Sequence, residues 1–492
     1  MKVALIRCPS SQGELTKTSL SQHPINLLYL ASYLIKNGHE VRVFDFEVDK
    51  FTVEGIVKFE PDLVGITAMT PLVKKAHEVA ELIVFNSIAN LDTDINKMTK
   101  KKRPIIVVGG NHVTAMPEEA MKEFPIFDIG VMGEGEETIK EICEGKSLKD
   151  ILGIVYREGD KNQRKNTDKI IVNQRRPPIC NLDDLPFPAR DSIDMKKYRG
   201  ASTPGLSREF LNITELYINR GCNWGLCTFC ASMKSHQKFR ERSIDNVIAE
   251  MKECIEKYKI NHFTIDDDTL TTSKERTLEF CNKVKPLNVT WDCDSRVTID
   301  KEMIQAMKDS GCKKIAFGVE SGSQKILQLV KKGITISQIK DCFKMCHEVG
   351  METSAFFMIG AHPDETLEDL EQTKKLIKEI KPDFITASIA VPYPGTELRE
   401  QMEKKKLVFN NNWDEYALYN TAPVWRTTNF SPDDLLRIQK EMVNEFYMKP
   451  SYMLKRLLKI RSWGEFKYWV KAFGGVRKTI FKGKKSDKQK TV

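Results

Sequence analysis

The sequence predicts an α/β protein with an open parallel sheet first, a partial (β/α)6 barrel second and a C-terminal helical segment. Two stretches of the chain alternate short apolar runs with helical periodicity, a rhythm typical of parallel sheets covered by helices. Between them, from about Ile154 to Arg190, the rhythm stops. At 492 residues the chain is long enough for two or three domains.

The first stretch predicts an N-terminal domain over residues 1–150. Its strands and helices are expected, in chain order, at Val3–Ile6, Pro24–Lys36, Val41–Phe44, Leu63–Thr67, Leu72–Ile88 and Ile105–Val108. In parallel sheets, cofactor-binding loops lie at the carboxyl ends of the strands. The loops expected there are Cys8–Ser10, Thr67–Thr70, Gly109–His112 and Gly133–Glu136.

Residues 151–195 are expected to connect the two domains. A hairpin is predicted from Gly153–Arg157 and Lys169–Val172, and it leads into Leu185–Asp191. Two prolines within three residues of that segment favour a stiff, extended chain. The domain boundary is therefore predicted there.

Residues 196–400 predict six βα units, which form a partial parallel barrel. The strands are expected at Leu216–Ile218, His262–Ile265, Val289–Asp292, Lys314–Phe317, Glu352–Ile359 and Asp383–Ala390. The helices between them are expected at Val247–Lys257, Lys274–Val284, Lys301–Ser310, Ser337–Val349 and Thr366–Ile380. Active sites of βα barrels lie at the carboxyl ends of the strands.

A loop rich in cysteine follows the first barrel strand. Cys222, Cys227 and Cys230 lie within nine residues of one another, and thiols this close are typical of metal or redox sites. Three sulfurs match an iron–sulfur cluster with one iron left open, since a fully protected cubane takes four cysteines. The alternative is a structural zinc site with His236 as the fourth ligand.

Composition and termini indicate where the protein works. Twelve cysteines without a pairing pattern, and an N-terminus without a signal-peptide cleavage site, predict a cytoplasmic protein with reduced thiols. No apolar run has the length of a membrane span. The net charge of +9 is modest and lies largely near the C-terminus, so a nucleic-acid partner is not expected.

The C-terminal region, residues 401–492, is predicted to be mostly helical with a basic tail. From Ser451 to Phe481, aromatic side chains mix with lysine and arginine. Such a helix can lie on an anionic membrane, which would make the protein membrane-associated, or pack on the barrel with its basic face in solvent. The sequence leaves both alternatives open.

The cysteine loop resembles the signature of the radical S-adenosylmethionine (SAM) enzymes, whose three loop cysteines hold a [4Fe-4S] cluster. Phe229 is the aromatic residue that the family places before the last cysteine. One interval departs from the pattern, because four residues, Asn223–Leu226, replace the usual three. Gly225 is expected to absorb the extra residue through an unusual backbone angle.

Positions after later barrel strands resemble the SAM-binding positions of this family. They are Asp266 and Asp267 after the second strand, Arg296 after the third and Glu320 after the fourth. A bound cation needs an acidic counter-charge, which favours this role for the aspartates. The alternative is that the acidic triplet of residues 266–268 caps the helix beginning at Lys274. The resemblance implies that these four residues and Phe229 bind SAM.

The N-terminal segment resembles the Rossmann-like cobalamin-binding domain often fused ahead of this barrel, through Gly109–Thr114 and Gly133–Glu136. The mutase-type Asp-x-His-x-x-Gly motif is missing, so His112 is expected to form hydrogen bonds rather than to ligate cobalt. The alternative is a Rossmann-like module that has lost its corrinoid. The residues that the resemblance assigns to cobalamin binding are Pro9, Ser10, Thr67, Met69, Thr70, Gly109, Gly110, His112, Gly133 and Glu134.

Together the resemblances imply a cobalamin-dependent radical SAM methyltransferase acting at an unreactive carbon through a 5′-deoxyadenosyl radical and methylcobalamin. Its cofactors would be a [4Fe-4S] cluster, SAM and cobalamin. Its partners would be a small-molecule or lipid substrate and an external one-electron reductant of the flavodoxin or ferredoxin type. Three alternatives remain: a cyclase or oxidative rearrangement enzyme with the same cofactors, a tRNA methylthiotransferase, and a non-catalytic corrinoid or SAM sensor.

Overall fold

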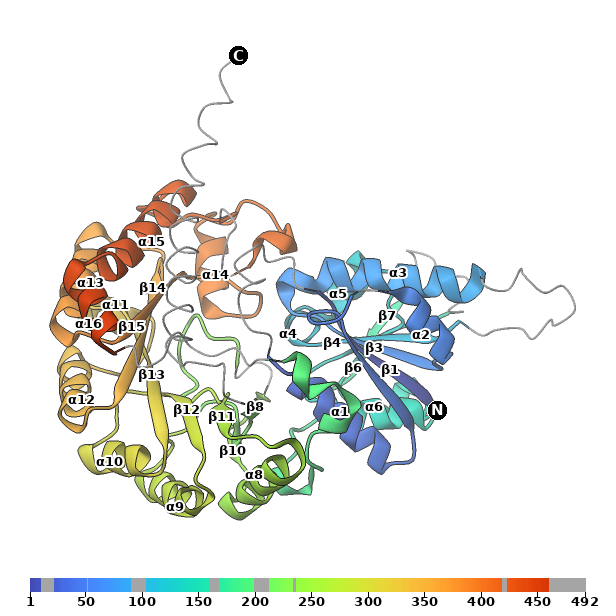
Figure 1. The fold of residues 1–492 in the computed structure, drawn as a ribbon. Coiled ribbons are helices and arrows are strands. Elements are labelled where there is room, and N and C mark those ends of the chain that lie inside the picture. The colour runs from blue at the N-terminus through green and yellow to red at the C-terminus, as the bar shows by residue number, and fades with distance from the viewer. Residues whose placement is uncertain are drawn as a thin grey trace, which may run out of the picture.

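The computed structural model describes residues 1–9, 22–50, 52–89, 103–159, 168–198, 212–232, 236–417 and 423–459. Two α/β parts lie side by side, the N-terminal domain at the right of Figure 1 and the barrel at the left. This arrangement confirms the predicted fold class: a Rossmann-like sheet domain, a six-stranded partial barrel and a helical C-terminal segment.

The N-terminal domain is built on a seven-stranded sheet of order β2-β1-β3-β4-β5-β6-β7. The first five strands of that order are parallel, and β6 and β7 form an antiparallel edge. The strands are β1 (Lys2–Arg7), β2 (Glu40–Asp45), β3 (Leu63–Thr67), β4 (Ile105–Gly109), β5 (Ile129–Val131), β6 (Ile154–Arg157) and β7 (Ile170–Val172). The helices are α1 (Ile25–Lys36), α2 (Val53–Phe59), α3 (Val73–Ala89), α4 (Asn111–Ala115), α5 (Pro117–Glu123) and α6 (Glu136–Cys143).

Alternation along the strands explains how helices cover both faces of this sheet. Val3 and Leu5 pack with the residues of α1 and α6, whereas Ala4 and Ile6 pack with those of α2, α3 and α5. Successive side chains of a strand point to opposite faces, so nearly continuous apolar runs indicate a strand buried on both sides. Figure 1 shows α3 and α5 on one side of the sheet and α1 and α6 on the other.

The barrel has six strands in the order β15-β14-β13-β12-β11-β8, and every neighbouring pair is parallel. The strands are β8 (Ile213–Leu216), β11 (His262–Ile265), β12 (Thr290–Ser295), β13 (Cys312–Glu320), β14 (Glu352–Ile359) and β15 (Phe384–Ile389). The helices are α8 (Ile244–Tyr258), α9 (Lys274–Val284), α10 (Lys301–Asp309), α11 (Gln324–Leu329), α12 (Ile336–Val349) and α13 (Leu367–Ile380).

Side-chain caps explain where the barrel helices begin. The side chains of Ser243, Ser273 and Asp300 accept backbone N–H groups in the first turns of α8, α9 and α10. Thr335 and Thr366 form capping boxes at α12 and α13. Each cap satisfies a donor that the first helical turn would otherwise leave unpaired.

The hairpin that the sequence analysis places in the connector continues the first sheet. Ile129 of β5 lies opposite Tyr156 of β6 in an antiparallel ladder, and β7 pairs with β6. The sheet therefore extends to Val172, beyond residue 150. The following segment crosses to the barrel, where the buried Arg190 pairs with Glu250 at 2.8 Å.

The C-terminal region begins with α14 (Glu397–Lys404), α15 (Pro432–Tyr447) and α16 (Pro450–Lys459). Helix α16 packs on the barrel through Tyr452 and Arg456, and the latter pairs with Glu352 at 2.8 Å. No helix in the described ranges is long and apolar enough to cross a membrane. Residues 460–492, which carry most of the predicted basic tail, lie outside the described residues.

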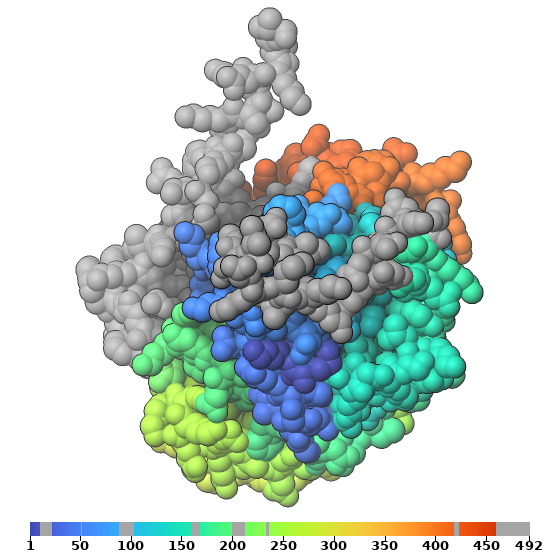
Figure 2. Space-filling view, turned by 90° about the vertical axis from the view of Figure 1, so that its right-hand side faces the viewer, coloured from blue at the N-terminus to red at the C-terminus, as the bar shows by residue number. Residues whose placement is uncertain are grey.

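Several contacts join the described residues of the two domains, and two of them involve Trp413 and His23. The first is made by a short 3-10 turn, Trp413–Glu415, whose Trp413 Nε1 donates to Glu123 of α5 at 2.9 Å. The second joins His23 to Glu215 of β8, with 2.5 Å between Nδ1 and Oε2. Figure 2, viewed from the side of the N-terminal domain, shows this domain in blue and teal, with the yellow-green part of the barrel below it and the orange C-terminal region above it.

Candidate functional site

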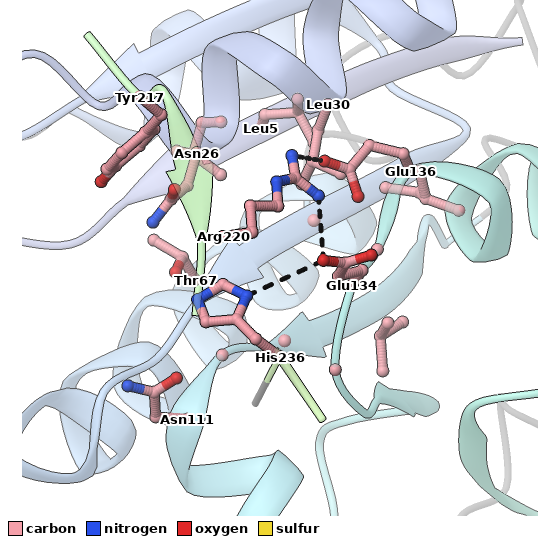
Figure 3. Close-up of a pocket in the computed structure, with 18 of the residues that line it drawn as sticks. Leu5, Asn26, Leu30, Thr67, Asn111, Glu134, Glu136, Tyr217, Arg220 and His236 are labelled. Carbon is pink, nitrogen blue, oxygen red and sulfur yellow. Dashed lines mark hydrogen bonds and ion pairs between the residues drawn. The ribbon is translucent and has the colours of Figure 1, made fainter. Parts of the chain in front are cut away.

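A cavity of about 340 Å³ lies between the N-terminal domain and the barrel (Figure 3). Its N-terminal wall includes the loops that follow β3, β4 and β5, and its barrel wall includes the segments that follow β8 and β11. The lining residues from these segments are Thr67, Gly109, Gly110, Asn111, Gly133, Glu134, Gly135, Tyr217, Asn219, Arg220, Gly221 and Asp266–Asp268. The carboxyl ends of the strands of both domains therefore face the same space.

The cysteine loop begins where β8 ends, next to this cavity. Gly221 and Gly225 have φ angles of +84° and +65°, values that L side chains rarely adopt. The structure therefore gives Gly225 the unusual angle expected for the four-residue interval. Cys227 and Cys230 are joined by a turn in which the Cys230 amide donates to the Cys227 carbonyl at 3.1 Å.

The three thiols of the loop lie close enough to affect one another electrostatically. The pKa of Cys230 is raised to about 11, chiefly by burial and also by the charges of Asp268, Cys227 and Cys222, while a backbone hydrogen bond lowers it. All three thiols belong to free cysteines of one short loop. A cluster binds each thiolate through a different iron, so this donor set fits an iron–sulfur cluster.

His236 does not join these thiols as the zinc alternative requires. Its Nδ1 lies 3.7 Å from Glu134 Oε1, across the cavity on the N-terminal domain. Figure 3 shows the imidazole directed at that carboxylate. The fourth ligand proposed for zinc is thus paired elsewhere.

The acidic triplet after β11 lines the cavity beside the cysteine loop. Asp266 accepts a hydrogen bond from the Tyr217 hydroxyl at 3.1 Å, and burial raises the pKa of its carboxyl to about 6. Asp267 Oδ1 accepts the amides of Ile218 and Asn219 at 2.9 and 3.1 Å, so it fixes the chain that enters the loop. The cap of α9 is Ser273, so the triplet does not cap this helix.

Asp267 lines the cavity and has one oxygen without a partner among the described residues. This oxygen, Oδ2, is buried. Burial raises the pKa of Asp267 to about 8, although two backbone amides act in the opposite direction. A buried acceptor without a partner is costly unless a ligand supplies a donor, so this oxygen fits the ammonium group of SAM.

Arg296 and Glu320 lie near enough to Cys227 for their charges to act on its thiol. Burial raises the pKa of the Cys227 thiol. The charges of Lys332 and Arg296 lower this pKa, and the charge of Glu320 raises it. Glu320, at φ +65°, pairs with Lys332 at 2.7 Å. Phe229, the remaining residue of the expected SAM-binding set, is half-buried against the apolar core.

Gly110 provides the closest backbone approach among the expected cobalamin-binding loops. Its φ is +115°, and a Cβ atom there would lie 2.6 Å from the Ala68 carbonyl oxygen. Thr67, Gly109, Gly133 and Glu134 line the cavity with it. Four other residues expected to bind cobalamin are described but do not line this cavity: Pro9, Met69, Thr70 and His112. Ser10 lies outside the described residues.

His112 is buried behind the glycine loop. Its ring meets Trp413 edge-on, with 4.9 Å between ring centroids, and is 1% exposed. Burial lowers the pKa of His112 to about 4, so the imidazole is neutral at physiological pH. The side chain therefore joins the N-terminal domain to the Trp413 turn.

A cluster of charged side chains closes one end of the cavity, and the sequence analysis missed it. Arg220 donates to Glu136 at 2.5 Å and lies 3.3 Å from Glu134 (Figure 3). Arg240 donates to both oxygens of Glu134, at 2.6 and 2.9 Å. Burial opposes the charge of Glu134, but the nearby His236 imidazole, the hydrogen bonds from Arg240 and the charge of Arg220 hold its pKa well below the usual range.

No sequence spacing links these residues, because they come from segments about a hundred positions apart. The only signal is that Arg220 directly precedes the glycine and cysteine of the loop, while Glu134 lies in a glycine-rich turn. The cluster ties the loop after β5 to the start of the cysteine loop. It therefore connects the expected cobalamin-binding and cluster-binding segments directly.

Comparison with known proteins agrees with this arrangement. A family model described as the radical SAM superfamily matches residues 216–377, and one described as the B12 binding domain matches residues 15–143. An uncharacterized methyltransferase of Pyrococcus horikoshii is 32% identical over 467 residues, which cover 92% of this chain and 94% of that protein. The anaerobic magnesium-protoporphyrin IX monomethyl ester cyclase of Rubrivivax gelatinosus is 26% identical over 455 residues, covering 87% of this chain and 74% of the cyclase.

A solved structure shares the whole architecture. The cobalamin-dependent SAM radical enzyme OxsB, with aqua-cobalamin and SAM bound, superposes with a TM-score of 0.69 at 17% identity, covering 97% of this chain and 71% of OxsB. That likeness concerns the fold. With both family models and the Pyrococcus relative, it leads to one conclusion: the chain belongs to the cobalamin-dependent radical SAM family.

Proposed function

We propose that this protein is a cobalamin-dependent radical SAM methyltransferase that acts on an unreactive carbon of a small molecule. The observation that carries the proposal is a cavity in the described part of the chain whose walls combine the glycine loops of the B12-type domain with Arg220 and Gly221, which directly precede Cys222. A donor of a methyl group and a source of a radical must reach the same substrate. A substrate in this cavity would be within reach of cofactors bound by either domain.

Different side chains of the site would bind the different cofactors. Cys222, Cys227 and Cys230 would bind the cluster, and the free oxygen of Asp267 would accept the ammonium group of SAM. Gly109 and Gly110 would admit the corrinoid close to the backbone. When bound, the cofactors supply the radical and methyl-transfer chemistry, while the protein positions them and excludes water.

An external one-electron reductant of the flavodoxin or ferredoxin type is part of this proposal, because reductive cleavage of SAM consumes an electron. A lipid substrate and a contact with an anionic membrane remain a finer proposal, supported by the basic, aromatic sequence that follows α16. Binding of the full chain to anionic vesicles, compared with a chain ending at Lys459, tests that finer proposal.

The experiment that tests the main proposal follows an isotope. The reconstituted enzyme is incubated anaerobically with SAM carrying a deuterated methyl group, a reductant and a small-molecule extract of the source cells. We expect a product that gains one deuterated methyl group, together with 5′-deoxyadenosine. A labelled product that forms equally with the Cys230→Ala variant would contradict the proposal.

A cyclase or oxidative rearrangement enzyme is the second candidate, favoured by the similarity to the Rubrivivax cyclase. The same experiment separates the two. A cyclised product loses hydrogen and carries no deuterium from the methyl group of SAM. 5′-Deoxyadenosine formed with a lighter, unlabelled product would therefore favour the cyclase.

A further inference from the structure

The extra residue of the cysteine loop belongs to a stretch that places an indole against the barrel. Trp224 lies in the four-residue interval, and its Nε1 donates to the carbonyl of Lys331 at 2.7 Å. Lys331 belongs to the turn between α11 and α12, more than a hundred residues away. Trp224 thus anchors the interval to the barrel, while Asn223 and Leu226 on either side are exposed.

The turn that receives the indole is shaped to fit it. Gly333 has a φ of +69°, and a Cβ atom at this position would lie 2.0 Å from Cζ2 and 2.4 Å from Cη2 of Trp224. Real Cβ contacts are never this short, so a side chain at residue 333 and the indole exclude each other. Trp224 and Gly333 are therefore complementary.

A second contact of the indole is made by Arg296. Its guanidinium carbon lies 4.8 Å from the centroid of the Trp224 ring, and its Nη2 donates to the Lys332 carbonyl at 2.8 Å. Lys332 in turn pairs with Glu320 at 2.7 Å. One turn, residues 331–333, thus supports the cluster loop and two side chains expected to bind SAM.

We propose that Trp224 is a positioning residue that couples the cluster loop to the SAM-binding side of the barrel by holding the Arg296 guanidinium in place. A guanidinium stacked on an indole and hydrogen-bonded at its edge has few remaining orientations, so its charge is aimed before SAM arrives. The inference rests on the proposed function. It assigns a role to the interval that departs from the family pattern.

The test uses variants on both sides of the contact. Trp224→Ala removes the ring, Trp224→Phe keeps a ring but loses the Nε1 donor, and Gly333→Ala displaces the indole without altering it. Gly145→Ala is the matched control, because Gly145 has a similar φ of +75° with nothing within 4 Å of its Cβ position. It therefore adds the backbone strain of Gly333→Ala without the collision.

Three quantities are measured for each reconstituted protein. They are iron per chain, the electron paramagnetic resonance spectrum of the reduced cluster with and without SAM, and the KM for SAM in 5′-deoxyadenosine formation without substrate. We expect Trp224→Ala and Gly333→Ala to keep their iron, to lose the SAM-induced spectral change at SAM concentrations that saturate the parent, and to raise KM by about 10-fold or more. Trp224→Phe should fall between them and the parent, and Gly145→Ala should match the parent.

A Trp224→Ala protein with the parent KM and the parent spectral response would overturn the inference while leaving the proposed function intact. Loss of iron in that variant would also overturn it, because Trp224 would then serve cluster assembly rather than the orientation of Arg296. A parent protein that binds a cluster but shows no response to SAM would overturn the proposed function, and this inference with it.

Discussion

Gly110 illustrates how a single residue sets the shape of the site. It combines a φ of +115° with a contact that leaves no room for a Cβ atom, whereas its neighbour Gly109 would place a Cβ atom 3.8 Å from Val131, an ordinary distance. The two glycines look alike in the sequence, and both line the cavity. Only the structure shows that the fold needs glycine at residue 110.

Gly110→Ala is therefore predicted to destabilise the protein, and Gly109→Ala is its matched control. Backbone strain and the collision with Ala68 should lower the free energy of unfolding of the Gly110→Ala apoprotein by about 2 kcal/mol or more. Urea unfolding without cofactors measures this directly. Equal stability of the two variants would contradict the account.

The raised pKa of Asp267 predicts that the free energy of unfolding depends on pH. Its pKa of about 8 in the folded protein lies above the value of about 3.9 for an unfolded aspartate, so the folded state binds the proton more tightly. The resulting stabilisation is fully present below about pH 4 and is lost as the pH rises toward about 8.

Asp267→Asn should remove this dependence, because the amide stays neutral and its oxygen can still accept the amides of Ile218 and Asn219. Relative to the parent apoprotein, the variant should gain at least about 1 kcal/mol of unfolding free energy between pH 5 and pH 8. Urea unfolding at several pH values measures the difference. The exposed Asp150→Asn variant is the control, and a constant difference between Asp267→Asn and the parent would refute the assignment.

At the scale of elements, the site depends on loops from two domains that face each other. The loop after β5 contributes Glu134, the start of α6 contributes Glu136, and the short strands β9 (Asn219–Arg220) and β10 (Arg240–Glu241) contribute the two arginines. Strands β9 and β10 pair antiparallel around the cysteine loop. Holding these strands therefore also holds the loop.

Arg220→Gln is predicted to loosen this junction. Removing one partner of a buried ion pair leaves an uncompensated charge, which costs about 3 kcal/mol of unfolding free energy. The control is Lys146→Gln, which breaks a more exposed pair with Glu141 and should cost less than about 1 kcal/mol. Urea unfolding monitored by tryptophan fluorescence compares them, and an Arg220→Gln cost as small as that of Lys146→Gln would show that the cluster does not join the domains.

The elements differ in how far the sequence predicts them. Strands such as Leu63–Thr67 and Glu352–Ile359 coincide with the prediction, because their apolar residues lie between clear breaks in the sequence. The helix Lys274–Val284 also coincides, since Ser273 supplies a cap that can be recognised in the sequence. The membership of the hairpin β6–β7 in the first sheet was not predictable, because strand pairing depends on long-range contacts.

In the site, too, local patterns could be predicted from the sequence and long-range contacts could not. The positions of the cysteine loop and the acidic triplet, after β8 and β11, could be predicted because each is a local pattern within one loop. The pairing of Arg220 with Glu136, and the contact of His112 with Trp413, join residues from different domains without a common spacing. Such contacts become visible only when the domains are docked.

On the scale of the whole molecule, the central claim is that one cavity serves two cofactors bound by two domains. The most direct test is to rebuild the protein anaerobically with iron, sulfide and hydroxocobalamin, remove unbound corrinoid, and measure iron and cobalt per chain. We predict about four irons and one cobalt in the parent, and loss of the iron with cobalt retained in Cys230→Ala. Four irons without cobalt in the parent would contradict the claim, because the N-terminal domain would then hold no corrinoid.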